Sequence, residues 1–368
     1  MMKKILLIDD ENIYRSIMRK NLSRYYEVLE APDGLQGISI LETHAIDLII
    51  LDMQMPLING LEFLDLYQRT GTRHVPVLVM SGLNEPDIIV QSYQRGAYDY
   101  ILKNENFEIL LKRIENGLKI GEQLRYNEEI KGELMMAKKL QELMLPPRVM
   151  SSNSLTVRTW NRPLSGIGGD LFDCIYFRDR RVMFYIADVV GHSISAALYT
   201  MMVKMLFGNT LKTTQDPGSI LTIMNHEIST IMKNGAFVTM FCGMIHLEEK
   251  RLEYSNAGNV YPLLRGRQGV EELRESEIFL GPFSDRVYKT VVRDFHPGDI
   301  LMVFTDGLVE LINDKDDILG NEYLKRILMD SYGNTNDMYR SIVDYLEKGD
   351  EYTIRDDCSF LLMEAHKE

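Results

Sequence analysis

Acidic residues in this sequence gather in two groups that could bind divalent cations and handle phosphate. In the first group, Asp9 and Asp10 follow the apolar run 5–8, and Asp52 follows the apolar run 48–51. Three carboxylates brought together repel one another unless a cation lies among them, and Mg²⁺ favours such an oxygen-lined, partly hydrated site. One carboxylate could then attack a phosphoryl group while a hydroxyl and an ammonium group stabilise the charge that spreads over it.

A hydroxyl and an ammonium group are available at the ends of two further apolar runs. Ser81 ends the run that begins at residue 77, and Lys103 follows the run 98–102. Each residue taken alone has an ordinary structural explanation, since Asp10 could cap the following helix and Lys103 could be a solvated surface cation. Their joint placement at successive strand ends favours a site for phosphoryl transfer.

The second acidic group is spread over the C-terminal half of the chain. Its members lie in the motifs Gly168-Gly169-Asp170, Ala187 to His192 (ADVVGH), Thr305-Asp306-Gly307 and Arg355-Asp356-Asp357. Two divalent ions bridged by carboxylates can hold and ionise a water molecule that attacks phosphorus with no covalent intermediate. The alternative is that these are turn aspartates, because Asp-Gly is a common hairpin signal.

The elements that must position the first group alternate over residues 1–120. Short apolar runs separated by amphipathic stretches predict five parallel strands and five helices in an open doubly wound α/β fold. Ligands of such folds bind beyond the carboxyl ends of the strands. The predicted strands are 5–8, 28–29, 48–51, 77–80 and 98–102.

A long helix is predicted over residues 105–145, where Pro146-Pro147 ends it. Its apolar residues recur at spacings of three and four, and Asn127 falls on the same stripe. The stripe could pair with a second copy as a coiled coil, giving a homodimer whose register Asn127 sets; alternatively, it packs on the chain's own domains. Three glycines weaken this helix and could act as hinges: Gly117, Gly121 and Gly132.

Strand-like segments dominate after residue 155, and four amphipathic helices interrupt them. The predicted strands include 182–187, 237–246, 251–255, 287–295 and 300–304, and the helices are 193–212, 216–234, 320–331 and 335–348. This order predicts an α+β sandwich. The predicted organisation is therefore a first domain at 1–120, a helical linker at 121–147 and a second domain at 148–368.

Composition restricts the compartment and the partners. A chain of 368 residues exceeds one comfortable core, and its net charge of −13 argues against nucleic acid as a partner. Three scattered cysteines fit a reducing compartment rather than a disulfide framework or a thiolate zinc site. No apolar stretch approaches the roughly 18 residues that a membrane span needs. We therefore expect a soluble cytoplasmic protein that does not enter a membrane.

The N-terminal segments resemble bacterial response-regulator receiver domains. They are ILLIDDE (5–11), LIILDMQMP (48–56), Met80-Ser81 and 100–103. The resemblance implies that a histidine kinase phosphorylates Asp52 and that Mg²⁺ binds Asp9, Asp10, Asp52 and the Gln54 carbonyl. It also implies that Ser81 and Lys103 contact the phosphoryl group and that Tyr100 is the aromatic switch residue. The family usually has a cis-proline after its lysine, but Asn104 stands here, so this loop could be trans and Lys103 placed differently.

Residues 136–364 resemble metal-dependent (PPM-type) protein serine/threonine phosphatases of the bacterial branch that regulates sigma-factor partner switching. The matching motifs are AKKLQELMLPP, GGDLFD, ADVVGHSISAAL, FVTMF, YSNAGN, GDILMVFTDGLVEL and RDDCSF. The resemblance implies a catalytic site with two Mn²⁺ or Mg²⁺ ions, held by Asp170, Asp188, Asp306, Asp356 and the Val189 carbonyl. Asp357 is the alternative to Asp356, which is preferred because the family ligand usually precedes the Asn or Asp of this pair.

Three positions depart from the phosphatase pattern beside these inferred ligands. Val190 and Ser193 replace a common Ser and a common Gly, and Asn259 replaces a common His. His192 is given no catalytic role, because a lone histidine at a helix start is more often a cap or a packing residue.

Two functions follow from these resemblances. The first is a two-component response regulator that dephosphorylates a phosphoserine on an anti-sigma factor antagonist under control of Asp52 phosphorylation. The alternative is a catalytically weak or inactive, phospho-controlled adaptor that binds a sigma-factor regulator. A degenerate adaptor would be expected to have lost ligands, so the presence of all four aspartates favours the enzyme.

Overall fold

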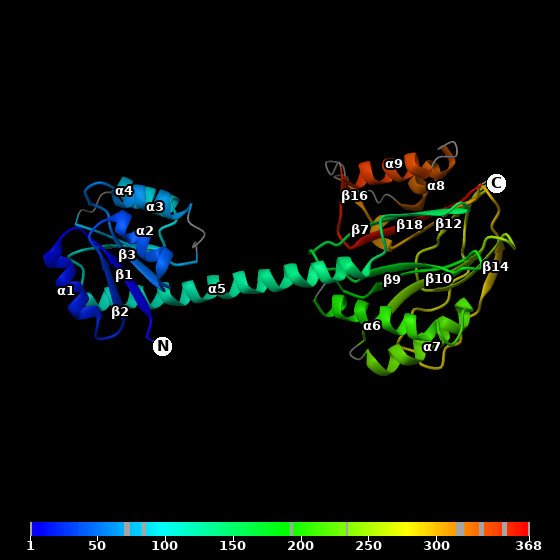
Figure 1. The fold of residues 1–368 in the computed structure, drawn as a ribbon, viewed down its shortest axis with the longest axis horizontal. Helices are drawn as coiled ribbons and strands as arrows, with labels where there is room; N and C mark the ends of the chain where they lie inside the picture. The colour runs from blue at the N-terminus through cyan, green and yellow to red at the C-terminus, as the bar shows by residue number, and fades with distance from the viewer. Residues whose placement is uncertain are drawn as a thin grey trace. The chain divides into compact units, whose positions relative to one another are not determined.

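The computed structural model describes residues 2–69, 74–82, 86–191, 194–232, 235–313, 320–330, 335–347 and 352–366. The chain forms two compact units, Met1–Glu133 and Leu134–Glu368 (Figure 1). The division between them falls inside the segment predicted as a linker. In the described ranges, no helix combines the length and the apolar character that crossing a bilayer requires.

The first unit is a parallel sheet covered by helices on both faces (Figure 1). Its elements are β1 (Lys4–Ile8), α1 (Asn12–Leu22), β2 (Glu27–Ala31), α2 (Gly34–Thr43), β3 (Leu48–Asp52), α3 (Gly60–Tyr67), β4 (Val77–Ser81), α4 (Pro86–Gln94), β5 (Asp99–Leu102) and the start of α5 (Phe107–Met144). The strand order is β2-β1-β3-β4-β5, which confirms the predicted doubly wound fold. Every residue of β3 and β4 is buried, as expected for central strands between two helical layers.

Helix α5 does not present its predicted apolar stripe as one free face. Leu110, Ile114 and Leu118 are buried in a core against the parallel sheet, so this part of the stripe packs on the chain's own domain. Farther along, Leu124 and Leu140 are 40% and 52% exposed. Most of the exposed apolar side chains of the helix therefore lie in its later part, although Ile109 and Ile120 are exposed as well.

Two of the three glycines in α5 permit close packing rather than marking hinges. A Cβ atom on Gly117 would lie 2.6 Å from Leu48 Cδ1, and one on Gly121 would lie 2.9 Å from Pro76 Cδ. A Cβ atom on Gly132 would meet nothing within 4 Å. Close packing therefore accounts for Gly117 and Gly121, whose missing side chains let the helix lie against the sheet, and the hinge interpretation stays a prediction.

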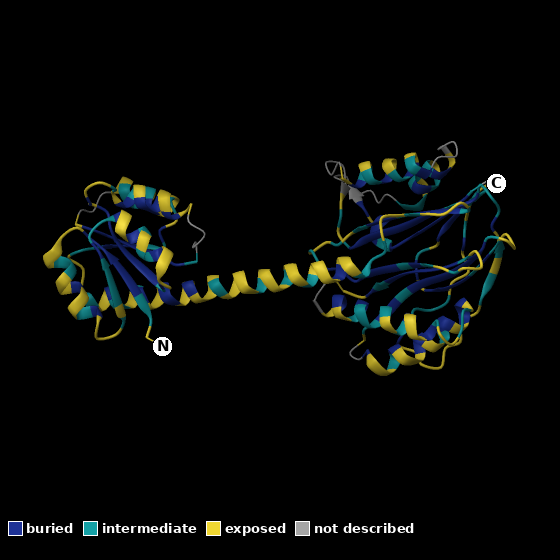
Figure 2. Ribbon diagram, viewed as in Figure 1, coloured by how far each residue is buried: buried dark blue, intermediate teal, exposed yellow. Residues whose placement is uncertain are grey.

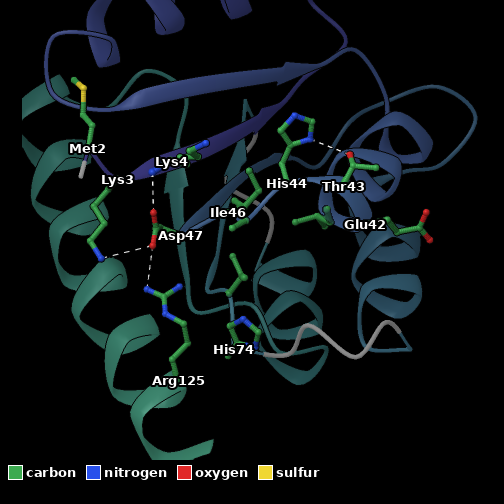
Figure 3. A pocket seen from close by; sticks show the side chains of 13 residues that line it. Met2, Lys3, Lys4, Glu42, Thr43, His44, Ile46, Asp47, His74 and Arg125 are labelled. Atoms are coloured by element: carbon green, nitrogen blue, oxygen red, sulfur yellow. Dashed lines mark hydrogen bonds and ion pairs between the residues drawn. The ribbon is translucent and has the colours of Figure 1, made fainter. Parts of the chain in front are cut away.

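Asp47 fastens α5 to the edge of the sheet away from the strand carboxyl ends (Figure 3). Its carboxylate accepts a hydrogen bond from the Lys4 backbone N–H at 2.8 Å and lies 3.0 Å from Arg125 Nη2. Lys3 Nζ lies 3.6 Å from the same carboxylate and 2.7 Å from Glu122. These contacts tie α5 to the first unit as far as residue 125, beyond the predicted domain limit at 120.

The second unit is a sandwich of two antiparallel sheets with a helical pair on each outer face (Figures 1 and 2). Its strands are β6 (Val149–Ser151), β7 (Leu155–Arg162), β8 (Asp170–Tyr176), β9 (Arg181–Val189), β10 (Val238–His246), β11 (Arg251–Ala257), β12 (Leu263–Gly266), β13 (Gly269–Glu272), β14 (Val291–Asp294), β15 (Ile300–Phe304), β16 (Ile312–Asn313), β17 (Tyr352–Thr353) and β18 (Cys358–Ala365). Its helices are α6 (Ile194–Thr210), α7 (Pro217–Ile231), η1 (Asp306–Leu308), α8 (Gly320–Asp330) and α9 (Thr335–Glu347).

The two main sheets follow the orders β14-β11-β10-β9-β8 and β13-β12-β15-β18-β7-β6, and β16 and β17 form a separate pair. Their facing side chains make a central core that includes Phe172, Phe184, Phe241 and Leu361. Figure 1 shows α6 and α7 over the first sheet and α8 and α9 over the second. The predicted α+β sandwich is confirmed, although the strand predicted at 287–295 is limited to β14.

Candidate functional sites

The first acidic group converges at the carboxyl ends of β1 and β3. Asp9 and Asp52 are buried and Asp10 is exposed, and carboxylate oxygens of all three lie within 4.8 Å of one another. Helix α1 begins after Glu11 without any side-chain cap, so Asp10 does not have the capping role that was its alternative. Three oxygen ligands in one half-open cluster fit a hard divalent cation such as Mg²⁺.

Lys103 reaches this cluster from the end of β5. Its Nζ lies 2.8 Å from Asp9 Oδ2 and 2.9 Å from Asp52 Oδ2. The peptide bonds of the described residues are all trans, so Lys103 reaches the acidic group without the cis-proline of the receiver family. Burial raises the pKa of Asp52, and the contact with Lys103 partly offsets that rise. For Lys103, burial alone would lower the pKa, but the hydrogen bonds to Asp9 and Asp52 outweigh burial, so the pKa of Lys103 is raised.

The other residues predicted at this site occupy different environments. Ser81 is buried at the end of β4, and its carbonyl oxygen accepts a hydrogen bond from the Lys103 N–H at 2.9 Å. Gln54 is exposed, and its N–H donates to Asp52 Oδ1 at 3.3 Å. Tyr100 is 9% exposed and packs into the core on one face of the sheet. Ser81 and Lys103 thus share one edge with the acidic group, and Tyr100 lies inward.

The second acidic group lies where the two sheets of the sandwich meet. Asp170 and Asp188 are paired residues on the neighbouring strands β8 and β9. Thr305, at the end of β15 in the opposite sheet, donates its hydroxyl hydrogen to Asp170 Oδ2 at 2.9 Å. Asp306 follows Thr305 and begins the short helix η1, so the hairpin alternative for Asp306-Gly307 is not what the structure has.

The carboxylates at this place repel one another; Asp170 is buried, and Asp188 and Asp306 are partly exposed. Burial raises the pKa of Asp170 well above its ordinary value, and the nearby Asp188 carboxylate adds to the rise. Burial, and after it the negative charges of Asp306, Asp356 and Asp357, raises the pKa of Asp188 to about 7. Burial, Glu310 and Asp356 likewise raise the pKa of Asp306. Such a concentration of negative charge away from water fits a cation-binding site.

An unpartnered oxygen supports the same conclusion. Within the described ranges, Oδ1 of the buried Asp170 has no hydrogen-bond partner. A buried polar atom left in this way calls for an ion or an ordered water. Among the described residues, however, only the receiver carboxylates approach within 4.8 Å as a set of three, so the second group is more widely spread.

Asp356 and Asp357 are separated clearly by their contacts. Asp357 is buried, and its two oxygens accept hydrogen bonds from the backbone N–H groups of Gly169 at 2.6 Å and Leu164 at 2.7 Å. Asp356 is partly exposed and acts on the pKa of both Asp188 and Asp306. Asp357 therefore shapes the backbone beside Asp170, whereas Asp356 accepts one hydrogen bond, from the Asp357 N–H to its Oδ1 at 2.8 Å.

Gly169 allows oxygen atoms to crowd around this backbone. A Cβ atom there would lie 2.4 Å from the Val189 carbonyl oxygen, 2.9 Å from the Gly191 carbonyl oxygen and 3.2 Å from Asp188 Oδ1. Any side chain would therefore collide with the predicted Val189 ligand.

The departures from the phosphatase pattern lie at the margins of this arrangement. Asn259 is buried and donates a hydrogen bond to the Phe304 carbonyl oxygen at 3.1 Å, which supports the strand that leads to Asp306. Val190 is 39% exposed beside Val189. His192 and Ser193 lie outside the described residues.

Two residues at this site were not assigned a role from the sequence. Thr305 sits inside the Thr-Asp-Gly motif and joins the two sheets. Gln141, near the end of α5, is buried: its Nε2 donates to the Gly168 carbonyl oxygen at 2.7 Å and its Oε1 accepts from the Gly168 N–H at 3.1 Å. Gln141 also donates to Thr200 Oγ1 in α6 at 3.3 Å. The sequence pattern that could have identified Gln141 is its position on one helical face between the apolar residues Ala137 and Met144.

Comparison with known families gives two matches that follow one another along the chain. The model of the response regulator receiver domain matches residues 5–115. The model of stage II sporulation protein E (SpoIIE) matches residues 178–366.

Individual proteins also resemble this chain over much of its length. Phosphoserine phosphatase RsbU of Bacillus subtilis (strain 168) is 23% identical over 238 residues, covering 64% of this chain and 71% of that protein. Regulator of RpoS of Escherichia coli (strain K12) is 26% identical over 293 residues, covering 73% of this chain and 85% of that protein. The SiaA-PP2C domain of Pseudomonas aeruginosa has the same fold, with a TM-score of 0.57 and 18% identity over 65% of this chain and 98% of that one.

Replacing each aspartate of the Asp356-Asp357 pair should separate their roles. Asp357→Ala leaves the Gly169 and Leu164 N–H groups without their acceptor, so we expect a loss of roughly 1–3 kcal/mol in the free energy of unfolding of the second unit. Asp356→Ala is the comparison: it removes one acceptor, that of the adjacent Asp357 N–H at 2.8 Å, and should therefore cost less, about 1 kcal/mol or below. Urea denaturation of the full chain measures both, and equal losses would contradict this assignment.

Proposed function

Because the chain belongs to the stage II sporulation protein E (SpoIIE) family and carries a response regulator receiver domain ahead of it, we propose that it is a phosphorylation-controlled protein serine/threonine phosphatase. Its proposed substrate is a phosphoserine on an anti-sigma factor antagonist, in keeping with the name of phosphoserine phosphatase RsbU. The observation that supports the proposal is the pairing of Asp170 with Asp188 on neighbouring strands, together with the hydrogen bond from Thr305, which precedes Asp306, to Asp170 across the two sheets.

The proposed catalytic residues divide the work of holding two Mn²⁺ or Mg²⁺ ions. Asp188, Asp306 and Asp356 are the proposed direct ligands together with the Val189 carbonyl, and Asp170 is proposed to hold a bound water. Two such ions would supply an ionised water as nucleophile and would neutralise charge on the phosphoryl oxygens. Thr305 orients Asp170 by its hydrogen bond, so that the unpartnered Oδ1 faces a fixed direction.

The receiver is proposed to accept a phosphoryl group from a histidine kinase on Asp52. Asp9, Asp10, Asp52 and the Gln54 carbonyl would hold Mg²⁺ there. Lys103 Nζ already contacts the carboxylates of Asp9 and Asp52. Phosphorylation of Asp52 would therefore add negative charge directly beside the Lys103 ammonium group. Ser81 and Tyr100 are the proposed switch residues.

Control of the second unit is proposed to pass through α5. The helix starts in the receiver fold, and Gln141 near its end holds both backbone polar groups of Gly168, two residues before Asp170. Moving the helix would break or make this contact and thus shift Asp170. Two arrangements of one element, biased by phosphorylation, are sufficient for a population shift.

A homodimer through α5 is also proposed. The later part of the helix exposes apolar side chains, among them Met135 at 63%, Met136 at 68% and Leu143 at 81%. Pairing with a second copy would remove these from water, as in a coiled coil.

The adaptor remains the second candidate, and one observation favours it. The match to Regulator of RpoS, whose name states a regulatory role and no enzymatic activity, covers both parts of the chain. Against it stands the intact set of aspartates, because a purely docking protein would have no physical reason to keep carboxylates that repel one another.

The decisive experiment for the phosphatase is release of phosphate from a purified phosphoserine antagonist protein, with Mn²⁺ added. Wild type should release phosphate. Asp188→Asn should lower the rate about 100-fold or more, because even residues that only support a metal ligand contribute 10- to 100-fold. Comparable rates for wild type and Asp188→Asn, or no release by either, would favour the adaptor.

Beryllium fluoride, which mimics an acyl phosphate, should change the phosphatase rate of the full-length chain by about fivefold or more, the lower range of typical coupling between sites. Asp52→Asn should abolish this response while keeping a basal rate, because the mimic would have no carboxylate to bind. A rate that beryllium fluoride leaves unchanged would remove the switching proposal.

Gln141→Ala should raise the Mn²⁺ concentration needed for half-maximal activity about tenfold, because two hydrogen bonds that position the Gly168 backbone are lost. Saturating Mn²⁺ should restore most of the rate. Glu142→Ala is the matched control, since Glu142 is exposed at the next position of the helix. An equal loss of rate at every Mn²⁺ concentration would contradict a role in positioning the site.

A further inference from the structure

A cavity of about 590 Å³ lies within the second unit between the end of α5 and the edge of β7. Lys138, Gln141 and Leu145 line it from the helix side, and Trp160 and Arg162 line it from the strand side. Strand β6 pairs only with residues 156–158 of β7, because Pro146-Pro147 precede it and prolines cannot continue the ladder. The cavity therefore opens where β7 loses its neighbouring strand.

The charged side chains that line the cavity are mostly basic. They are Lys138, Arg148 and Arg162, against the single acid Glu142, in a chain whose net charge is −13. Lys138 and Arg148 are exposed at the mouth of the cavity and, among the described residues, their side chains have no hydrogen-bond or ion-pair partner; the same is true of the indole N–H of the buried Trp160. Arg162 gives one hydrogen bond, from Nη1 to the Leu346 carbonyl oxygen at 3.1 Å.

Apart from the one hydrogen bond of Arg162, these basic side chains have no acceptor from the described part of the protein. Guanidinium and ammonium groups bind carboxylate and phosphate oxygens in charge-assisted hydrogen bonds, and guanidinium can do so with two bonds at once. A volume of about 590 Å³ is within the range of small-molecule sites in proteins. We propose that this cavity binds a small polyanion carrying phosphate or carboxylate groups, with Lys138, Arg148 and Arg162 as the residues that neutralise it.

Such a ligand would join α5 to the sandwich at a sensitive place. Gln141, which forms part of the cavity wall, also holds the Gly168 backbone. A polyanion between Lys138 of the helix and Arg162 of the strand would hold the end of α5 against β7. The binding site itself does not depend on the proposed phosphatase activity.

The chain offers a direct reporter of this binding, because Trp160 is its single tryptophan and lines the cavity. We expect pyrophosphate or citrate, titrated into full-length protein without added divalent cations, to change the tryptophan fluorescence in a saturable way. Pyrophosphate tests the phosphate source and citrate the carboxylate source. Asp188→Asn should bind equally well, which separates this site from the proposed metal site.

Removing the unpartnered cations should weaken the binding. The double variant Lys138→Gln, Arg148→Gln should raise the dissociation constant about tenfold or more. Lys139→Gln is the matched control, because Lys139 is an exposed lysine on the same helix that does not line the cavity. No saturable change with either probe, or equal binding by the double variant and the Lys139 control, would overturn the proposal.

Discussion

Repulsion between neighbouring carboxylates, of which Asp9, Asp52 and Asp170 are buried, is the interaction on which both sites depend. At each site the fold brings aspartates from separate strands to one place, where loss of hydration makes their negative charge costly. In the receiver, Lys103 offsets part of that cost by contacting Asp9 and Asp52. No lysine or arginine contact with Asp170 or Asp188 occurs among the described residues, and the pKa of Asp188 rises to about 7. The second site thus retains the stronger demand for cations.

Backbone contacts around the second site explain how such repulsion is tolerated. Asp357 accepts hydrogen bonds from Gly169 and Leu164, and Thr305 ties Asp170 to the opposite sheet. Gln141 adds the end of α5 to the same network through Gly168. Because these bonds hold the Gly168-Gly169 backbone that leads into Asp170, the proposed movement of α5 would act next to the acidic group. Catalytic geometry and the proposed control therefore share one set of contacts.

Fold class was predictable because burial leaves a local pattern of apolar residues in the sequence. Strands such as Ile5–Ile8 and Leu48–Leu51 are buried on both faces, so they read as continuous apolar runs. The packing of α5 was less accessible, because spacing identifies an apolar stripe but not the surface it meets. Leu110 and Leu140 share one predicted stripe, yet one lies in a core and the other is half exposed. Gly121 likewise weakens a helix in sequence terms, whereas its contact with Pro76 appears only in the folded chain.

Local sequence pattern was enough to identify residue types suited to holding cations and the strands that precede them, because carboxylates at strand ends can be recognised from a few neighbouring residues. It could not decide how Asp356 and Asp357 divide their roles, since neighbouring residues of one type have the same local signal. Tertiary structure separated them by turning Asp357 toward the N–H groups of residues far away in the chain. The same is true of Thr305 and Gln141, whose importance comes from partners 135 and 27 residues distant. Long-range hydrogen bonds of this kind leave no periodic trace, so only the folded chain reveals them.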